Sequence, residues 1–333
     1  QVTPTRRQHP LPSHYGRSVN SSNRLAYGFA VVASVVSGML VAGQSRVNGE
    51  LGLRLGDGAL AALISFSIGF LILSVAMMVS ARGREGLRVV ISDLRAGRLP
   101  WWSVLGGLGG GFLVLTQGLV AGILGVALFS VAVVAGQTLG AMVIDSRGWV
   151  GVPRVRLSLP RVIGAIIAVV GVMVSVEVWA GQAASVSWGF VLPLLAGAGT
   201  GLQQALNGTV RQRASSALTA TWINFGVGTT ALAVVWVVLL PVTSGPDVLP
   251  TDWWLYAGGL LGTLFIPIQT ITVHRIGVLG LGVSLVTGQI LASLALDLIV
   301  PVGDFPVGAW TITGAVLTVV GSVLVTMSRR RST

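Results

Sequence analysis

Ten apolar stretches, each about as long as a lipid bilayer is thick, constrain the fold of this chain more than any other feature. A bilayer core of about 30 Å requires about 20 apolar residues in one helix. Only 9% of the residues are charged, against about 25% in a soluble domain. The ten stretches are residues 25–44, 59–80, 102–121, 126–144, 162–178, 188–204, 218–241, 254–273, 279–300 and 310–327. The predicted fold class is therefore all-α integral membrane, with about ten transmembrane helices.

The arginines predict how these helices are oriented. If the helices alternate in direction, all but two of the 21 basic residues, which are all Arg, fall on the side of both termini. The exceptions are Arg46 and Arg54. Cytoplasmic segments of membrane proteins are enriched in basic residues, so both termini are predicted to be cytoplasmic. This topology also accounts for the net charge of +11, so the expected partner is the lipid bilayer, with no nucleic acid.

The sequence contains two copies of a five-helix module. GQSRVNGELGLRLGDGALAALISFSIG, from residue 43, aligns without gaps with LQQALNGTVRQRASSALTATWINFGVG, from residue 202. Further matches join residues 101–118 to 253–270 and residues 136–145 to 288–297. The predicted units are a disordered basic tail (1–24), a first module (25–179), a second module (186–328) and a basic tail (329–333). Because five is odd, the repeat is inverted, as is typical of secondary transporters.

The paired QxxxNG, FxxG, GQ and D signatures on a five-plus-five arrangement resemble the drug/metabolite transporter superfamily. Within it they are similar to the YdcZ-type family of inner membrane exporters, whose five-helix modules occur singly or fused in tandem. The resemblance covers about residues 25–327. It implies a transporter-like fold, with the first four helices of each module around a central cavity and the fifth at the periphery. It implies no particular cargo.

Amide side chains within the apolar helices are the candidate substrate contacts, because a polar group in lipid costs free energy unless it faces a partner or a wet cavity. Most of them occupy matching positions in the two modules, and Asn224 aligns with Ser65. Hydrogen bonding between helices is the competing interpretation. The candidates are Gln44, Asn48, Gln117, Gln137, Gln203, Asn207, Asn224, Gln269 and Gln289.

Two acids are candidates for proton coupling. Asp145 follows Gln137 at a spacing that puts both side chains on one face of a helix, and Asp297 follows Gln289 at the same spacing in the second module. A carboxyl shielded from water can bind a proton in the working pH range. The competing interpretation is structural, because both acids sit near predicted helix ends, where each could cap a helix or pair with an Arg.

Other features narrow the function. The chain has no Cys and three scattered His, so we expect no metal site, no cofactor and no catalytic residues. Glycines at matching positions of the fifth helices, such as Gly164 and Gly314, allow close contacts between helices. We therefore expect that two chains can form a homodimer through the peripheral fifth helix of each module.

The favoured function is secondary transport of a small organic solute across a bacterial plasma membrane by alternating access, with export as the direction implied by the resemblance. A membrane-embedded enzyme or carrier acting on a lipid or isoprenoid substrate is one alternative. That enzyme should group acids, His or Arg at one membrane face, and the sequence shows no such group. A non-transporting membrane scaffold is another alternative, and it leaves the repeated amides unexplained.

Overall fold

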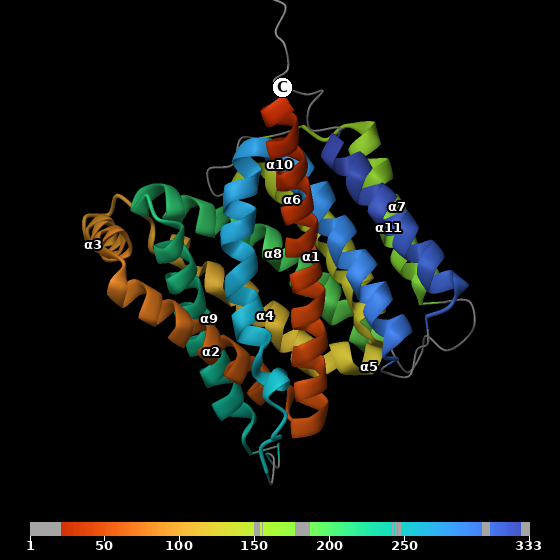
Figure 1. Ribbon diagram of the computed structural model, residues 1–333, viewed down its shortest axis with the longest axis horizontal. Helices are drawn as coiled ribbons and strands as arrows, with labels where there is room; N and C mark the ends of the chain where they lie inside the picture. The colour runs from red at the N-terminus through yellow and green to blue at the C-terminus, as the bar shows by residue number, and fades with distance from the viewer. Residues whose placement is uncertain are drawn as a thin grey trace, which may run out of the picture.

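A computed structural model describes residues 21–149, 154, 156–176, 187–241, 243, 245, 248–301 and 307–327. Most of the predicted amino-terminal tail and all of the carboxyl-terminal tail lie outside these residues. The helices are α1 (Ser21–Leu55), α2 (Gly58–Val79), α3 (Ala81–Arg95), α4 (Gly106–Thr116), α5 (Gly122–Leu124), α6 (Val126–Arg147), α7 (Leu159–Ser175), α8 (Ser187–Ala214), α9 (Ala217–Leu239), α10 (Gly258–Ile299) and α11 (Ala309–Met327) (Figure 1). The described residues contain no strand, so the prediction of an all-α membrane fold is confirmed.

Seven helical segments of the described chain are long and apolar enough to cross a membrane, and α7 is a shorter apolar helix. One of the seven, Trp101–Leu124, is built from several pieces. It begins with a 3₁₀ turn (Trp101–Leu105), continues as α4, passes through a π-helical turn (Gln117–Ala121) and ends as α5. Gly125, at φ +80°, separates it from α6. Glycine accepts this positive φ without strain, which allows the sharp turn between two spanning segments.

Two predicted spanning helices, residues 254–273 and 279–300, fall within the single helix α10. The Ser37 hydroxyl donates to the carbonyl of Phe265 (3.3 Å), while its neighbour Gly38 lies against the backbone of Leu285. Phe265 and Leu285 would be about 30 Å apart on a straight helix. The helix therefore turns back on itself, and Figure 1 shows its rising and descending arms on either side of α1. The two predicted crossings are thus its two arms.

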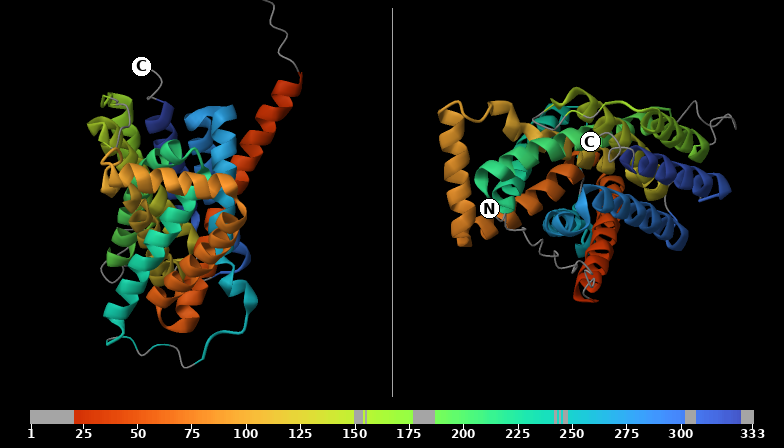
Figure 2. Two further views of the ribbon diagram at one scale, coloured as in Figure 1. Left: turned by 90° about the vertical axis from the view of Figure 1, so that its left-hand side faces the viewer. Right: turned by 90° about the horizontal axis from the view of Figure 1, so that it is seen from above.

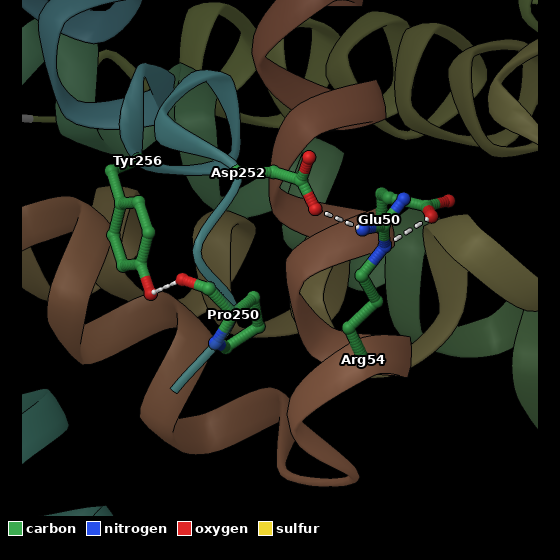
Figure 3. Close-up of polar contacts among 5 residues, drawn as sticks. All are labelled: Glu50, Arg54, Pro250, Asp252 and Tyr256. Atoms are coloured by element: carbon green, nitrogen blue, oxygen red, sulfur yellow. Dashed lines mark hydrogen bonds and ion pairs between the residues drawn. The ribbon is translucent and has the colours of Figure 1, made fainter. Parts of the chain in front are cut away.

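The two ends of the bundle are distinguishable. The start of α1 and the end of α11 lie at the same end (Figures 1 and 2), as an inverted repeat with an odd number of helices per module requires. We call this end the terminal face and the other end the opposite face. At the opposite face, Arg54 bonds to Glu50 and to Asp252, and the Tyr256 hydroxyl donates to the Pro250 carbonyl (2.7 Å) (Figure 3). The contact between Arg54 and Asp252 holds the end of α1 against the segment that leads into α10.

The gap between the second and third predicted spanning helices contains a further helix, α3. It lies across the direction of the bundle (Figure 2). Gly86 and Val90 are buried on one side, and Arg84 and Arg88 are exposed on the other. Such an amphipathic basic helix is typical of the membrane interface. The Thr219 hydroxyl at the start of α9 donates to the Gly83 carbonyl (2.9 Å), which fixes α3 to the second module.

The peripheral helices α7 and α11 pack against each other through glycine. A side chain at Gly164 would meet the Gly321 carbonyl, and one at Gly314 would meet Gly171, so the two backbones approach closely. The glycine faces of both fifth helices are thus used within one chain. A homodimer through the fifth helices remains a prediction, and it would have to use their other faces.

Candidate substrate site

A cavity of about 200 Å³ lies between the two modules. It is bordered by residues of α1, α2, α4, α6, α8, α9 and α10. Seven of the nine predicted amides line it, namely Gln44, Gln137, Gln203, Asn207, Asn224, Gln269 and Gln289. The other two, Asn48 and Gln117, lie outside it. The repeat therefore brings most of the candidate residues to one place, although they span almost 250 positions of the sequence.

Two phenylalanines from α2 and α9 form part of the cavity wall. The rings of Phe66 and Phe225 stack with centroids 4.8 Å apart. These residues are equivalent in the two modules, so the stack joins the two copies at their shared centre. The stack belongs to a buried apolar cluster that includes Leu73 and Leu232.

Gln44 and Gln203 lie beside the phenylalanine stack in equivalent positions. The Gln44 amide donates to the Gly258 carbonyl (3.0 Å), and the Gln203 amide donates to the Asn224 side-chain oxygen (3.0 Å). A Cβ at Gly262 would lie 2.6 Å from the Gln44 amide nitrogen, and a Cβ at Gly110 would lie 2.5 Å from that of Gln203. The two amides thus occupy the space that a side chain at Gly262 or Gly110 would take.

The two modules differ one helical turn after Gln44 and Gln203. At this turn, α1 packs tightly against its neighbours and closes the path to the opposite face. Asn48 is fully buried and donates to the side-chain oxygen of Gln117 (2.7 Å). Gln117 in turn donates to the Ser45 hydroxyl (3.0 Å). A Cβ at Gly49 would lie 2.6 Å from the backbone nitrogen of Gly122. The π-helical turn carries Gln117 into this contact, and no space remains between α1 and the α4–α5 segment.

The equivalent turn of α8 is open toward the terminal face. Asn207 is part-exposed and donates to the Asn224 oxygen (2.9 Å), while a Cβ at Gly208 would meet no atom within 4 Å among the residues whose side chains are described. Gln204, the counterpart of buried Ser45, is exposed. A second cavity of about 170 Å³ shares Gln137 and Gln204 with the first and extends along α11 as far as Thr326, near the terminal face.

The candidate acids Asp145 and Asp297 differ in their partners. Asp145 accepts a hydrogen bond from Arg161 of α7 (2.9 Å), and both side chains are buried. Asp297 accepts a bond from the backbone of Ala127 (2.7 Å), at the start of α6, and one of its oxygens lies 4.0 Å from Arg46. Neither acid lines the described cavities. The structure places Asp145 near the terminal face and Asp297 near the opposite face.

The comparisons with known proteins agree with the repeat. A family model described as "Putative inner membrane exporter, YdcZ" matches residues 29–174 and again residues 188–324. The chain belongs to the YdcZ family. It is thus a multi-pass membrane protein of an exporter family of the drug/metabolite transporter type, built from two fused modules. No curated protein sequence matches the chain.

One solved structure, titled "Crystal structure of protein", matches 93% of this YdcZ-family chain and 99% of its own length, with 21% identity and a TM-score of 0.49. We draw nothing from a likeness at that level. The family assignment rests on the two matched modules, which together cover most of the sequence.

Sequence reasoning missed several residues of the cavity in this YdcZ-family protein. Gln204 and Thr200 on α8 line both cavities. Gln204 stands beside a predicted candidate, but its counterpart Ser45 is not an amide, so the repeat gave no signal. Phe66 and Phe225 were matched in the repeat, and an aromatic pair at equivalent positions could have marked the centre of the molecule.

The described residues contain no group of three or more His, Asp or Glu side chains that could hold a metal ion. The wall of the cavity offers hydrogen bonds from amides and contact with aromatic rings.

Proposed function

We propose that this protein moves a small organic solute across the bacterial plasma membrane by alternating access. The observation that carries the proposal is the different state of two equivalent turns, closed at Asn48 and Gly49 but open at Asn207 and Gly208. Since the modules share one sequence pattern, exchanging their conformations would close the terminal face and open the opposite face. A solute in the central cavity would then face the other side of the membrane.

The arginine distribution and the family support export as the direction of transport. With the terminal face in the cytoplasm, the described conformation is open to the cytoplasm and ready to load cargo for export. In the exchanged conformation Asn207 would contact Gln269, as Asn48 now contacts Gln117. The closed contact at the opposite face would come apart.

Thiol labelling tests this proposal, because the chain has no native Cys. Ser45→Cys and Gln204→Cys place one thiol each at equivalent positions on the closed and the open side. In reconstituted vesicles, a membrane-impermeant maleimide added at the terminal face should label Gln204→Cys rapidly. Added at the opposite face, it should label Ser45→Cys slowly, through the minor conformation.

Trapping separates alternating access from a static pore. A short cross-linker joining Asn48→Cys to Gln117→Cys should abolish labelling of Ser45→Cys and stop exchange between the two faces, while Gln204→Cys stays reactive. Labelling of Ser45→Cys that persists after cross-linking, or that never occurs from the opposite face, would contradict the proposal.

We propose Asp297 rather than Asp145 as the coupling acid. Asp145 is held by the buried Arg161, whereas one oxygen of Asp297 has no hydrogen-bond partner in the described chain and faces Arg46 at 4.0 Å. Its other oxygen binds the backbone at the start of α6. A proton on Asp297 would weaken both contacts and release α6 and α10 at the closed face.

Replacement of Asp297 tests this role. Asp297→Asn keeps the size of the side chain and a carbonyl oxygen for the α6 backbone. It should abolish the effect of a pH gradient on the labelling rate of Ser45→Cys, while Ser45→Cys without this change responds to the gradient. An unchanged response in Asp297→Asn would exclude the acid from coupling.

A further inference from the structure

Three amides that line the cavity make no side-chain hydrogen bond with the described residues: the exposed Gln204, and the pair Gln137 and Gln289. Gln137 on α6 and Gln289 on α10 are equivalent in the two modules, and both line the cavity. Gln289 is only 5% exposed, yet its amide nitrogen has no partner in the described chain. Buried polar groups are nearly always paired, and leaving one unpaired costs free energy. A bound molecule with a matching acceptor would satisfy this nitrogen.

The hydrogen-bonding groups of the wall favour a flat polar edge. A side-chain amide presents a donor and an acceptor side by side in one plane. This is why Gln and Asn bind the edge of a base such as adenine through two parallel bonds. Gln44 and Gln269 each donate one amide hydrogen, to Gly258 and Ser37 respectively, and their carbonyl oxygens are available as acceptors. The cavity thus has both kinds of group for a planar amide or heterocycle.

Charge is missing from the described wall of the cavity. None of its described lining residues is ionisable. An ion taken from water into such a site would lose its hydration without gaining a counter-charge, and this is strongly unfavourable. The nearest candidate acids, Asp145 and Asp297, lie outside the wall. A wall of uncharged amides and apolar side chains therefore disfavours the binding of both anions and cations.

Size and aromatic contact limit the guest further. A cavity of about 150 Å³ can hold one benzene ring, so the cavity of about 200 Å³ fits a molecule of one or two rings. Phe66, Phe225 and Phe265 line it and provide aromatic surface. Aromatic pairs stabilise each other beyond the effect of buried area. A flat ring system would gain this contact, whereas a flexible chain would not.

We infer that the cargo is an uncharged, planar molecule of one or two rings that carries amide-like donor and acceptor groups, held at its edges by Gln137 and Gln289. This inference rests on the proposed transport function, because it names the class of solute for the same cavity. It assigns the two unpaired amides to recognition and the phenylalanines to the faces of the ring.

Three probes of nearly equal size test the inference on the full-length purified protein. Nicotinamide is neutral, nicotinate carries a negative charge, and 1-methylnicotinamide carries a positive charge. Nicotinamide should raise the melting temperature in detergent, with a dissociation constant at least tenfold lower than that of either charged probe. Adenine, a neutral two-ring molecule with similar edges, should also bind.

Substitutions of the two cavity amides test where nicotinamide binds. Gln137→Met and Gln289→Met keep the length of the side chains and remove their hydrogen bonds, so each should weaken nicotinamide binding by tenfold or more. Thr313→Val changes an exposed side chain on α11 and should leave binding unchanged. The comparison of the three probes on the unmodified protein needs no variant, so the test remains decisive if a variant fails to fold.

The possible results test the cargo class and the transport mechanism separately. Tighter binding of a charged probe, or no binding of nicotinamide and adenine at millimolar concentration, would overturn the inference. Alternating labelling of Ser45→Cys and Gln204→Cys needs no added cargo, so the transport proposal would survive that result. If labelling does not alternate but nicotinamide still binds through Gln137 and Gln289, the transport proposal fails and the binding site remains.

Discussion

At the scale of single residues, equivalent side chains of the two modules have taken different partners. Asp145 pairs with Arg161 on α7, but Asp297 binds the start of α6 and lies near Arg46 on α1. The two arginines that the charge pattern leaves at the opposite face, Arg46 and Arg54, both lie beside acids of the second module. Each of these two positive charges thus lies near a negative charge. This explains how they can lie at the opposite face although basic residues favour the cytoplasmic side.

The pair formed by Asp145 and Arg161 is expected to be structural. Asp145→Asn leaves the buried Arg161 without a counter-charge, and removing one member of a buried ion pair destabilises a protein by about 3–5 kcal/mol. The melting temperature should fall clearly in this variant. The double variant Asp145→Asn with Arg161→Met should recover much of the loss, because no buried charge is left unpaired. A single variant that melts like the parent protein would refute a structural role.

At the scale of helices, glycine decides how closely the elements approach. Gly49 on α1 and Gly208 on α8 are equivalent, yet a side chain at Gly49 would meet Gly122, whereas one at Gly208 would meet no described atom within 4 Å. The helix pair at the closed face therefore depends on the absence of a side chain. The same residue type on α8 is free in this conformation and would become restricted only in the exchanged one.

Alanine at these two glycines should shift the conformational equilibrium in opposite directions. Gly49→Ala inserts a methyl group into the closed contact, and overpacking of this kind costs about 1–3 kcal/mol. The opposite face should open more often, so labelling of Ser45→Cys from that face should rise about tenfold.

Gly208→Ala is the matched control. It adds a methyl group where no described atom lies within 4 Å, and this methyl group would be overpacked only in the exchanged conformation. It should therefore favour the described conformation and slow the labelling of Ser45→Cys. Equal effects of the two substitutions would mean that the two turns do not exchange states.

At the scale of the whole molecule, the start of α1 and the end of α11 lie at one end of the bundle, and α3 lies across it (Figures 1 and 2). The orientation in the membrane is still a prediction from arginine. It places α3 and the wider opening of the cavity in the cytoplasm.

Two exposed positions test this orientation. Ile91→Cys lies on α3, and Val248→Cys lies before α10 at the opposite face; both native side chains are exposed. In intact cells, an impermeant maleimide should label Val248→Cys at least tenfold faster than Ile91→Cys, and membrane disruption should remove the difference. The reverse order would mean that the terminal face is periplasmic.

Much of the fold could be predicted from the sequence because its signals are local or repeated. The length of each apolar run reports a membrane crossing, and the aligned runs from residues 43 and 202 report the inverted duplication. Residues 82–100 were recognised only as a gap, because the amphipathic helix α3 has a charged composition and is not a spanning segment. Helix α10 joins two predicted helices, because no proline or charge run separates them strongly enough to end the helix.

The candidate site could be predicted only in part. Amides in lipid must face a partner or a cavity, so the sequence by itself determined which side chains to consider and which occupy equivalent places. Only the tertiary structure decided that Asn48 and Gln117 bind each other, while Gln137 and Gln289 line the cavity and make no side-chain hydrogen bond within the described part of the chain. The physical reason is that two nearly equivalent modules share one pattern, and their states differ through packing between helices far apart in the chain.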